Sequence, residues 1–280
     1  MRDFEQSEPV RIAPKIWVVA SENDTFRVLR TEQRPNIKHD VAVSYRSPRT
    51  VRALLNGAVY AAFGTHGKQG KPHPVSAVRL AYMLAGSYHH LQTPLRLARA
   101  AATFKRLQRD NVAAFLELKV CEEAGHDHLA LQDLAALGLP AERTVEVLRP
   151  PVSGRLLELL DSYSKRAYPI AVLGYTFCME RLAIFYGEKD ITAYQEVCPP
   201  GADATRCLRV HSGVGADDEH VDEVVEFITT LEKRDVALIA EATCETASVM
   251  VDALLEDATT TDVDIASRLR HVGITLPFTA

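Results

Sequence analysis

Apolar residues recur at helical spacing over most of the chain, from about Ser47 onward. Each of these stretches carries an apolar stripe, and polar or proline-containing breaks separate them. The clearest breaks are Pro150-Pro151 and Pro199-Pro200-Gly201, and a further break is expected near Thr93-Pro94 inside one long segment. The pattern predicts helices over residues 47–64, 74–107, 111–138, 153–165, 168–187, 216–233 and 234–257.

The first 47 residues have a different pattern. Short β-prone runs, KIWVVA, FRVLR and VAVSY, alternate with polar stretches that contain proline. We predict an N-terminal arm over residues 1–47, with a small β-hairpin, and a helical domain over residues 48–280. The arm either covers the bundle or mediates contacts with a second copy, so a homodimer is one expectation. Because each amphipathic helix must bury its stripe against others, the rest of the chain predicts an all-α bundle.

Charged side chains interrupt the apolar stripe in three of the predicted helices. In CEEAGHDHLALQDLAALG, residues 121–138, Glu123 and His126 lie among the apolar residues of one face. In AVLGYTFCMERLAIFYG, Glu180 falls in phase with the large apolar residues. In ADDEHVDEVVEFITTL, Asp217 and His220 extend the stripe at its N-terminal end. A buried, unpaired carboxylate is costly, so acids and imidazoles from three helices predict a shared metal ion.

Each of these residues also has an ordinary structural explanation. A single Glu or His on a predicted stripe is usually a residue at the edge of the buried face. Glu122 is an alternative to Glu123, because it lies four residues before His126. His128 is expected at the surface, and the His89-His90 pair on a helix face or at the rim of a pocket. The metal hypothesis therefore depends on the three helices supplying ligands together.

Composition and charge exclude several classes of function. The 280 residues are 47% hydrophobic and 25% charged, with a net charge of −5, which is usual for a globular protein. A basic stripe is absent, so nucleic acid is not an expected partner. No apolar run is long enough for a membrane span. Five dispersed cysteines and an N-terminus without a secretory signal predict a reduced, cytoplasmic protein.

At its three motifs the chain resembles the haem-oxygenase-like superfamily, in particular its non-haem diiron oxidases. The motifs are EEAGHDHLALQDLAALGL, VLGYTFCMERLA and HSGVGADDEHVDEVVEFI, and the resembling portion runs from about residue 50 to 255. The resemblance implies a bundle of about seven helices. It also implies two Fe²⁺ ions and O₂ as cofactors. The metal ligands that it implies are Glu123, His126, Glu180, His211, Asp217 and His220.

Two features depart from that family's pattern. The third motif is usually His-x3-Asp-x2-His, whereas five residues separate His211 from Asp217 in this chain. His211 is therefore out of phase with His220 on a regular helix, and it joins the site only if the glycine-containing backbone leaves α geometry. Otherwise His211 pairs in phase with Asp218, which is an alternative ligand. Some members carry a Glu seven residues before the first His, where this chain has Lys119.

The resemblance implies a diiron oxidase or oxygenase that activates O₂. Its expected substrate is a small amine, amino acid or carboxylate, with N-oxygenation, desaturation or C–C cleavage as the outcome. A metal-free enzyme like thiaminase II or pyrroloquinoline quinone synthase is the alternative. The thiaminase type needs a cysteine nucleophile, for which Cys207 is conceivable, whereas Cys178 faces away from Glu180. A non-catalytic binding bundle is a third hypothesis, and it predicts that the acids do not converge.

Overall fold

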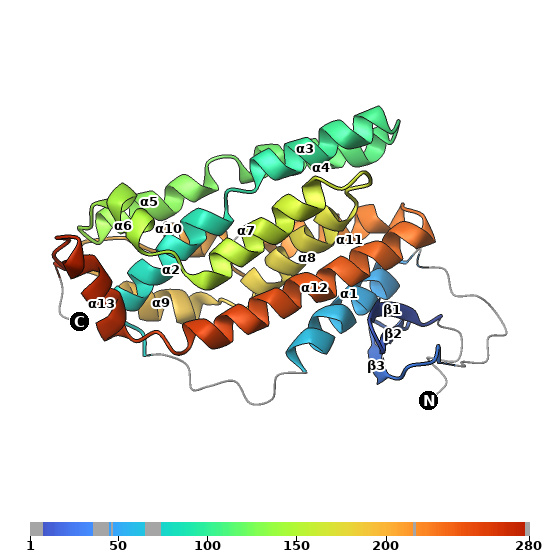
Figure 1. The fold of residues 1–280 in the computed structure, drawn as a ribbon, viewed down its shortest axis with the longest axis horizontal. Coiled ribbons are helices and arrows are strands. Elements are labelled where there is room, and N and C mark those ends of the chain that lie inside the picture. Colours follow the sequence, from blue (N-terminus) through green and yellow to red (C-terminus); the bar gives the residue numbers. More distant parts are fainter. Residues whose placement is uncertain (1–7, 36–44, 46, 65–73, 215–216, 278–280) are drawn as a thin grey trace.

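The helices expected from the apolar spacing are present in the structure, a computed structural model, although most are shorter than expected (Figure 1). The structure describes residues 8–35, 45, 47–64, 74–214 and 217–277, without the side chains of Asp217 and Asp218. Within these residues, no helix combines the length and the apolar character that crossing a membrane requires. The strands are β1 (Val10–Ala13), β2 (Ile16–Ala20) and β3 (Phe26–Arg30). The helices are α1 (Pro48–Phe63), α2 (Ala77–His90), α3 (Pro94–Arg106), α4 (Asp110–Glu123), α5 (His126–Ala136), α6 (Ala141–Val147), α7 (Pro151–Ser164), α8 (Ala171–Ala183), α9 (Glu188–Glu196), α10 (Arg206–Val210), α11 (Asp217–Thr229), α12 (Lys233–Asp257) and α13 (Asp262–His271).

The segment 111–138 is two helices, so the expectation of one continuous helix was wrong. α4 ends at Glu123, and Gly125 then has a φ of 86°, in the left-handed region that interrupts a helix. The break expected near Thr93-Pro94 is confirmed, because α2 ends at His90 and α3 begins at Pro94. The helices α6, α9, α10 and α13 were not predicted, because segments of five to ten residues show too little of an apolar stripe.

The N-terminal arm forms an antiparallel sheet in the order β1-β2-β3, one strand more than the expected hairpin. Residues Val18, Val19 and Ala20 of the central strand are at most 1% exposed. The sheet packs against α1 and α12 (Figure 1). A Cβ atom on Gly57 of α1 would lie 2.6 Å from the Val18 side chain, so the close approach requires glycine there. The arm therefore covers the bundle, while most of the VAVSY segment lies outside the described residues.

The buried apolar residues form two clusters, which we call the sheet-side core and the distal core. The sheet-side core joins the sheet to α1, α3, α4, α7, α8, α11 and the first half of α12, and it includes Leu54, Phe104, Leu116, Leu160, Phe177 and Ile239. The distal core joins α2, α5, α6, α9, α10 and α13, and it includes Leu80, Leu84, Leu134, Leu137, Val145 and Leu269. α12 packs against α1, α7 and α8 and leads into α13 (Figure 1).

Candidate metal centre

Glu123 and His126 lie at the junction between the two cores. Glu123 is the last residue of α4, which packs in the sheet-side core, and His126 is the first residue of α5, which packs in the distal core. The turn at Gly125 leaves the Nδ1 atom of His126 3.4 Å from the Oε2 atom of Glu123. A turn, rather than the face of one helix, therefore brings these two side chains together.

His211 joins this pair from a third segment. It follows α10 directly, with a φ of −100° and a ψ of 70°, so its backbone has left α geometry. Its ring lies edge-on to that of His126, with the ring centroids 4.8 Å apart. The backbone N–H of Gly213 donates to the carbonyl of Tyr186 at 3.0 Å and anchors the loop. One ligand atom from each of Glu123, His126 and His211 lies within 4.8 Å of the others, and this is the candidate metal group among the described residues.

The protonation states in this group suit a metal ion. Burial opposes the ionisation of Glu123, but the hydrogen bond from His126 and the nearby imidazoles outweigh it, so the pKa of Glu123 lies below its usual value. Burial lowers the pKa of His211 to about 4, and the ring is therefore neutral at pH 7. A carboxylate and a neutral imidazole are the forms that coordinate metal ions. Two imidazoles and one carboxylate are a donor set that fits ferrous iron.

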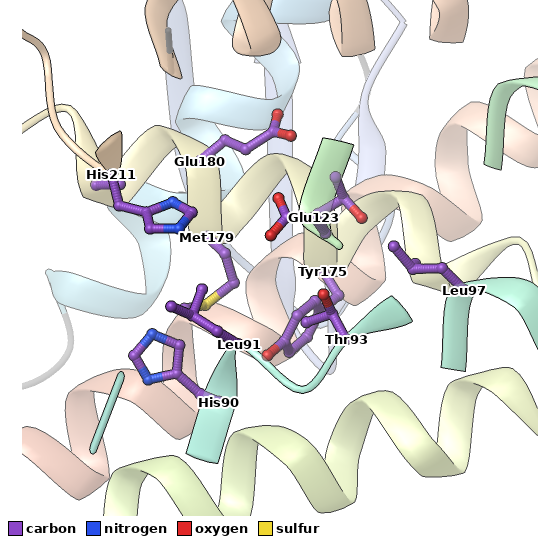
Figure 2. A pocket seen from close by; sticks show the side chains of 11 residues that line it. His90, Leu91, Thr93, Leu97, Glu123, Tyr175, Met179, Glu180 and His211 are labelled. Atoms are coloured by element: carbon purple, nitrogen blue, oxygen red, sulfur yellow. The ribbon is translucent and has the colours of Figure 1, made fainter. Parts of the chain in front are cut away.

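Glu180 of α8 borders the same space as Glu123 and His211 (Figure 2). Glu180 is 7% exposed, and its Oε1 atom lies 3.5 Å from the Nζ atom of Lys119. Lys119 is itself 1% exposed, and its Nζ atom lies 2.8 Å from Glu122 and 3.3 Å from Glu223. Burial acts to lower the pKa of Lys119, but these carboxylates raise it above its usual value. Lys119 is therefore a buried cation that sequence reasoning missed, and Glu122, the alternative ligand, is paired with it.

The third motif is described only in part. His220 is half-buried near the start of α11, which packs against α8. It lies close enough to His211 for its charge to lower the pKa of that ring. The side chains of Asp217 and Asp218 lie outside the described residues. The ligand roles of His220, Asp217 and Asp218 therefore stay predictions.

Two adjoining cavities meet at the metal group. The smaller has a volume of about 80 Å³ and is bordered by Glu123, Glu180 and His211 (Figure 2). The larger has a volume of about 370 Å³, lies between α2, α8 and α12, and has mostly apolar walls. His90 and His211 border both cavities. The larger cavity has the size and the apolar character of a pocket for a small organic molecule.

The remaining histidines of the sequence analysis lie as expected. His90 is at the boundary of the two cavities, and burial lowers its pKa to about 4. His89 faces the distal core, where its Nε2 atom lies 2.8 Å from the carbonyl oxygen of Val145. His128 is exposed, as predicted. His90 is thus a residue of the site that the sequence reasoning considered only as a possible rim position.

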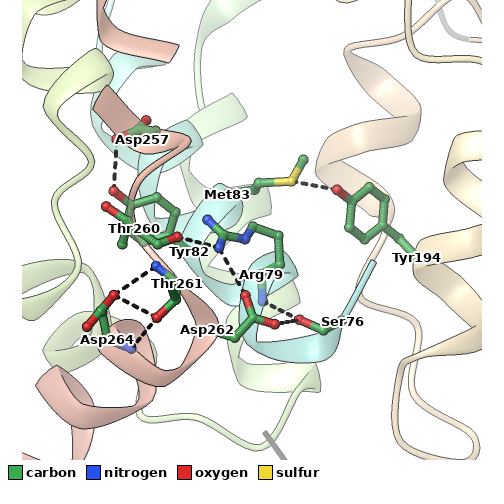
Figure 3. A network of polar contacts seen from close by, with 10 residues as sticks. All are labelled: Ser76, Arg79, Tyr82, Met83, Tyr194, Asp257, Thr260, Thr261, Asp262 and Asp264. Carbon is green, nitrogen blue, oxygen red and sulfur yellow. Dashed lines mark hydrogen bonds and ion pairs between the residues drawn. The ribbon is translucent and has the colours of Figure 1, made fainter. Parts of the chain in front are cut away.

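The lining of the larger cavity includes the polar side chains of Tyr82 and Asp257 at its far end, and Figure 3 shows the network of polar contacts that they join. The hydroxyl of Tyr82 donates to the Oδ1 atom of Asp257 at 3.0 Å, and both residues line the cavity. Burial raises the pKa of Asp257 above its usual value, against the bond from Tyr82. Nearby, Arg79 is paired with Asp262 at 3.0 Å, so its charge is already matched. Tyr82 lies eight residues before His90 in α2, which is about 12 Å along the helix axis.

The two cysteines considered as nucleophiles are both buried. Cys178 is 0% exposed and Cys207 is 2% exposed. Burial raises the pKa of the Cys207 thiol to about 12, and it also raises that of Cys178. Cys207 borders the larger cavity, whereas Cys178 packs in the sheet-side core. Neither side chain is a thiolate at pH 7, which is the nucleophilic form.

No family model and no curated protein matches the chain. Several solved structures are similar to it, among them the following two. A domain of unknown function with a haem oxygenase-like fold from Shewanella denitrificans is 22% identical, with a TM-score of 0.56, and the match covers 82% of this chain and 94% of that one. A TenA homologue from Pseudomonas syringae pathovar tomato is 14% identical, with a TM-score of 0.54, and the match covers 77% of this chain and 96% of that one. The chain therefore has a haem oxygenase-like fold, and identities at this level carry the comparison no further than the fold.

Proposed function

We propose that the protein is an iron-dependent oxidase that uses O₂ to oxidise a small molecule. The observation that supports this most strongly is the group of Glu123, His126 and His211 beside an apolar cavity. Two imidazoles and a carboxylate that leave other coordination positions open are the ligand set of many non-haem iron oxygenases. When bound to this group, iron would supply the activation of O₂.

The chain's own residues would contribute in different ways. Glu123 supplies negative charge, His211 supplies a neutral imidazole, and His126 supplies a second imidazole. His90, neutral at the boundary of the cavities, is suited to hold a substrate by a hydrogen bond without adding charge. The apolar walls exclude water from the reacting part of the substrate. The second Fe²⁺ implied by the resemblance stays a prediction, and its candidate ligands are Glu180, Asp217 and His220.

The larger cavity favours an amine with an apolar chain as the substrate. Its rim carries exposed apolar side chains, those of Phe185, Tyr186 and Leu254. Its far end offers the carboxyl group of Asp257 beside Tyr82, which suits an ammonium group and repels a carboxylate. Because this end lies about 12 Å along α2 from His90, an amine bound there brings carbon rather than nitrogen to the metal group. We therefore rank desaturation or C–C cleavage ahead of N-oxygenation.

Anaerobic loading with Fe²⁺, followed by desalting and iron quantification, tests the metal part of the proposal. The wild-type chain is expected to retain iron, and His211→Ala is expected to lose it. His128→Ala is the matched control, because it removes an exposed imidazole two residues from His126. A wild-type chain that retains no iron would contradict the proposal.

Oxygen consumption by the iron-loaded protein tests the substrate class. Primary alkyl amines and alkyl carboxylates of equal chain length are compared, and the amines are expected to give the faster consumption. Asp257→Asn should remove most of this preference, because it replaces the carboxylate by a neutral group of the same shape. Faster consumption with the carboxylates would exclude an amine bound at Asp257.

A metal-free hydrolase is the second candidate, because Cys207 borders the larger cavity and one similar structure is a TenA homologue. The raised pKa of the Cys207 thiol argues against it. This candidate predicts turnover of a thiamine-like substrate that survives removal of metal by a chelator and is lost in Cys207→Ser. The oxidase proposal predicts that the chelator abolishes turnover and that Cys207→Ser retains it.

A further inference from the structure

Lys119 lies on the buried face of α4, four residues before Glu123 and three after Leu116. It is 1% exposed, which is rare for a lysine. Its Nζ atom lies 3.5 Å from Glu180 and 2.8 Å from Glu122. A buried ammonium group is stable only with such partners, because its removal from water is costly. The fold therefore holds a fixed positive charge beside the cavity that Glu123, Glu180 and His211 border.

A second metal ion, if bound to Glu180, would lie beside this ammonium group. Metal ions are bound where the surrounding side chains supply negative charge. An ion bound to the Oε1 atom of Glu180 would lie about 2 Å from it, while the Lys119 Nζ atom lies 3.5 Å from that same atom. The two cations would then be separated by at most about 5.5 Å in a poorly solvated interior, where like charges repel strongly. Glu180 also falls outside the group of ligand atoms formed by Glu123, His126 and His211 among the described residues.

We propose that the ammonium group of Lys119 substitutes for a second metal ion, so that the centre binds one metal ion per chain. This inference rests on the proposed function, because it assumes a metal ion at Glu123, His126 and His211. Glu180 is then a partner of Lys119 that keeps the ammonium in place, rather than a metal ligand. The sequence resemblance implies two metal ions, and the proposed single ion differs from that expectation because of one residue, Lys119.

Metal stoichiometry in the full-length chain tests this inference without any assay of activity. Wild type, Lys119→Glu and Lys105→Glu are titrated with Mn²⁺ in equilibrium dialysis, and the bound ions are examined by electron paramagnetic resonance. Wild type should bind one ion, with the spectrum of a single Mn²⁺. Lys119→Glu should bind two, with the spectrum of a coupled pair, because it replaces the cation by a carboxylate. Lys105→Glu, an exchange at an exposed lysine, should stay at one.

The outcomes separate the two proposals. Two ions bound to the wild type would overturn the role of Lys119 and leave the metal-dependent function standing. No ion bound to the wild type would overturn both. One ion bound to a folded Lys119→Glu, as to the wild type, would show that Lys119 does not set the stoichiometry. If Lys119→Glu does not fold by circular dichroism, Lys119→Gln replaces it, with two ions expected again and one ion counting against the inference.

Discussion

The sheet-side core and the distal core contribute different chemistry to the candidate site. The sheet-side core is built on long helices and the sheet, and it carries the carboxylates of Glu123 and Glu180. The distal core is built on α2 and several short helices, and its helix ends carry the imidazoles of His90, His126 and His211. A core of short helices contains many helix ends. The side chains at these ends are positioned by turns rather than by the face of a helix. The sheet-side core therefore positions the carboxylates of the site, and the distal core positions its imidazoles.

The largest expected effect comes from emptying the sheet-side core. Phe104 is fully buried there, so Phe104→Ala is expected to lower the free energy of unfolding by about 3–5 kcal/mol. If the two cores unfold as one unit, the slowest-exchanging amides of α3 and of α5 lose the same protection. Native-state amide hydrogen exchange measures both. Unchanged protection in α5 would show instead that the distal core unfolds separately.

The matched control for the Phe104→Ala substitution is Leu118→Ala. Leu118 is half exposed on α4, two residues after Leu116 of the same core. Its truncation should change the free energy of unfolding by less than about 0.5 kcal/mol, since little buried contact is lost. A large effect at Leu118 would mean that another surface covers it.

Metal binding should tie the two cores together, because the three clustered ligands come from both. At a free Fe²⁺ concentration 100 times the dissociation constant, the free energy of unfolding should rise by about 2.7 kcal/mol. Anaerobic urea unfolding with and without Fe²⁺ measures the gain, which His211→Ala should abolish. Added protection should appear in both α4 and α5, and protection confined to one of them would contradict a bridging ion.

Within the sheet-side core, the contact between α8 and α12 depends on Gly174. A Cβ atom there would lie 2.4 Å from the carbonyl oxygen of Ile239 and 2.8 Å from the Cβ atom of Ala242. Gly174→Ala should therefore force the helices apart and lower the free energy of unfolding by about 1–3 kcal/mol. Gly154→Ala on α7 meets no atom within 4 Å, and it should be neutral or stabilising by up to about 1 kcal/mol. Urea unfolding compares the two variants, and equal effects would exclude a packing cause.

The turn between the cores gives a smaller but more specific effect. Gly125 has a φ of 86° and a Cβ atom there would meet nothing within 4 Å, so Gly125→Ala costs about 1–2 kcal/mol through the backbone alone. Gly201→Ala is the matched control, because Gly201 has a φ of 80° and is equally open. Both should lower stability alike in urea unfolding. Only Gly125→Ala should weaken Fe²⁺ binding, because it shifts Glu123 relative to His126, and equal binding by both variants would argue against the turn as a positioning element.

Much of the fold could be predicted because long apolar stripes leave little choice. The 25 residues of α12 and the 16 of α1 show several turns of stripe each, so their positions followed from spacing. α10 has only five residues, and no period can be read from it. The end of α4 was missed for a similar reason. Gly125 stands inside a sequence that otherwise continues at helical spacing, and only its left-handed backbone reveals the break.

The candidate site was predicted where an acid or an imidazole interrupted an apolar stripe. Glu123, His126 and Glu180 were found in this way, because the cost of burying a polar group applies at the level of sequence. Lys119 follows the same rule and was overlooked, although its spacing from Leu116 and Glu123 puts it on the buried face. A lysine is usually assigned to the surface because its long stem reaches water. Two of its three carboxylate partners, Glu180 and Glu223, come from other helices and become visible only in the folded chain.

The smallest expected effect concerns the distal core and pH. Burial lowers the pKa of His89, whose Nε2–H donates to the carbonyl oxygen of Val145 in the distal core. Because its pKa is higher in the unfolded chain, near 6.5, the unfolded state binds more protons as the pH falls below about 6.5. Stability is therefore fully present above this pH and is lost on acidification.

His89→Gln should keep a hydrogen bond to Val145 and make the fall in stability between pH 6.5 and pH 5 shallower, as measured by urea unfolding. Part of the slope should remain, because burial also lowers the pKa of His90 and His211. His128→Gln removes an exposed imidazole and should leave the slope unchanged. If His89→Gln keeps the full wild-type slope, the distal core does not bury a neutral His89, and the acid sensitivity of the chain arises at the metal group alone.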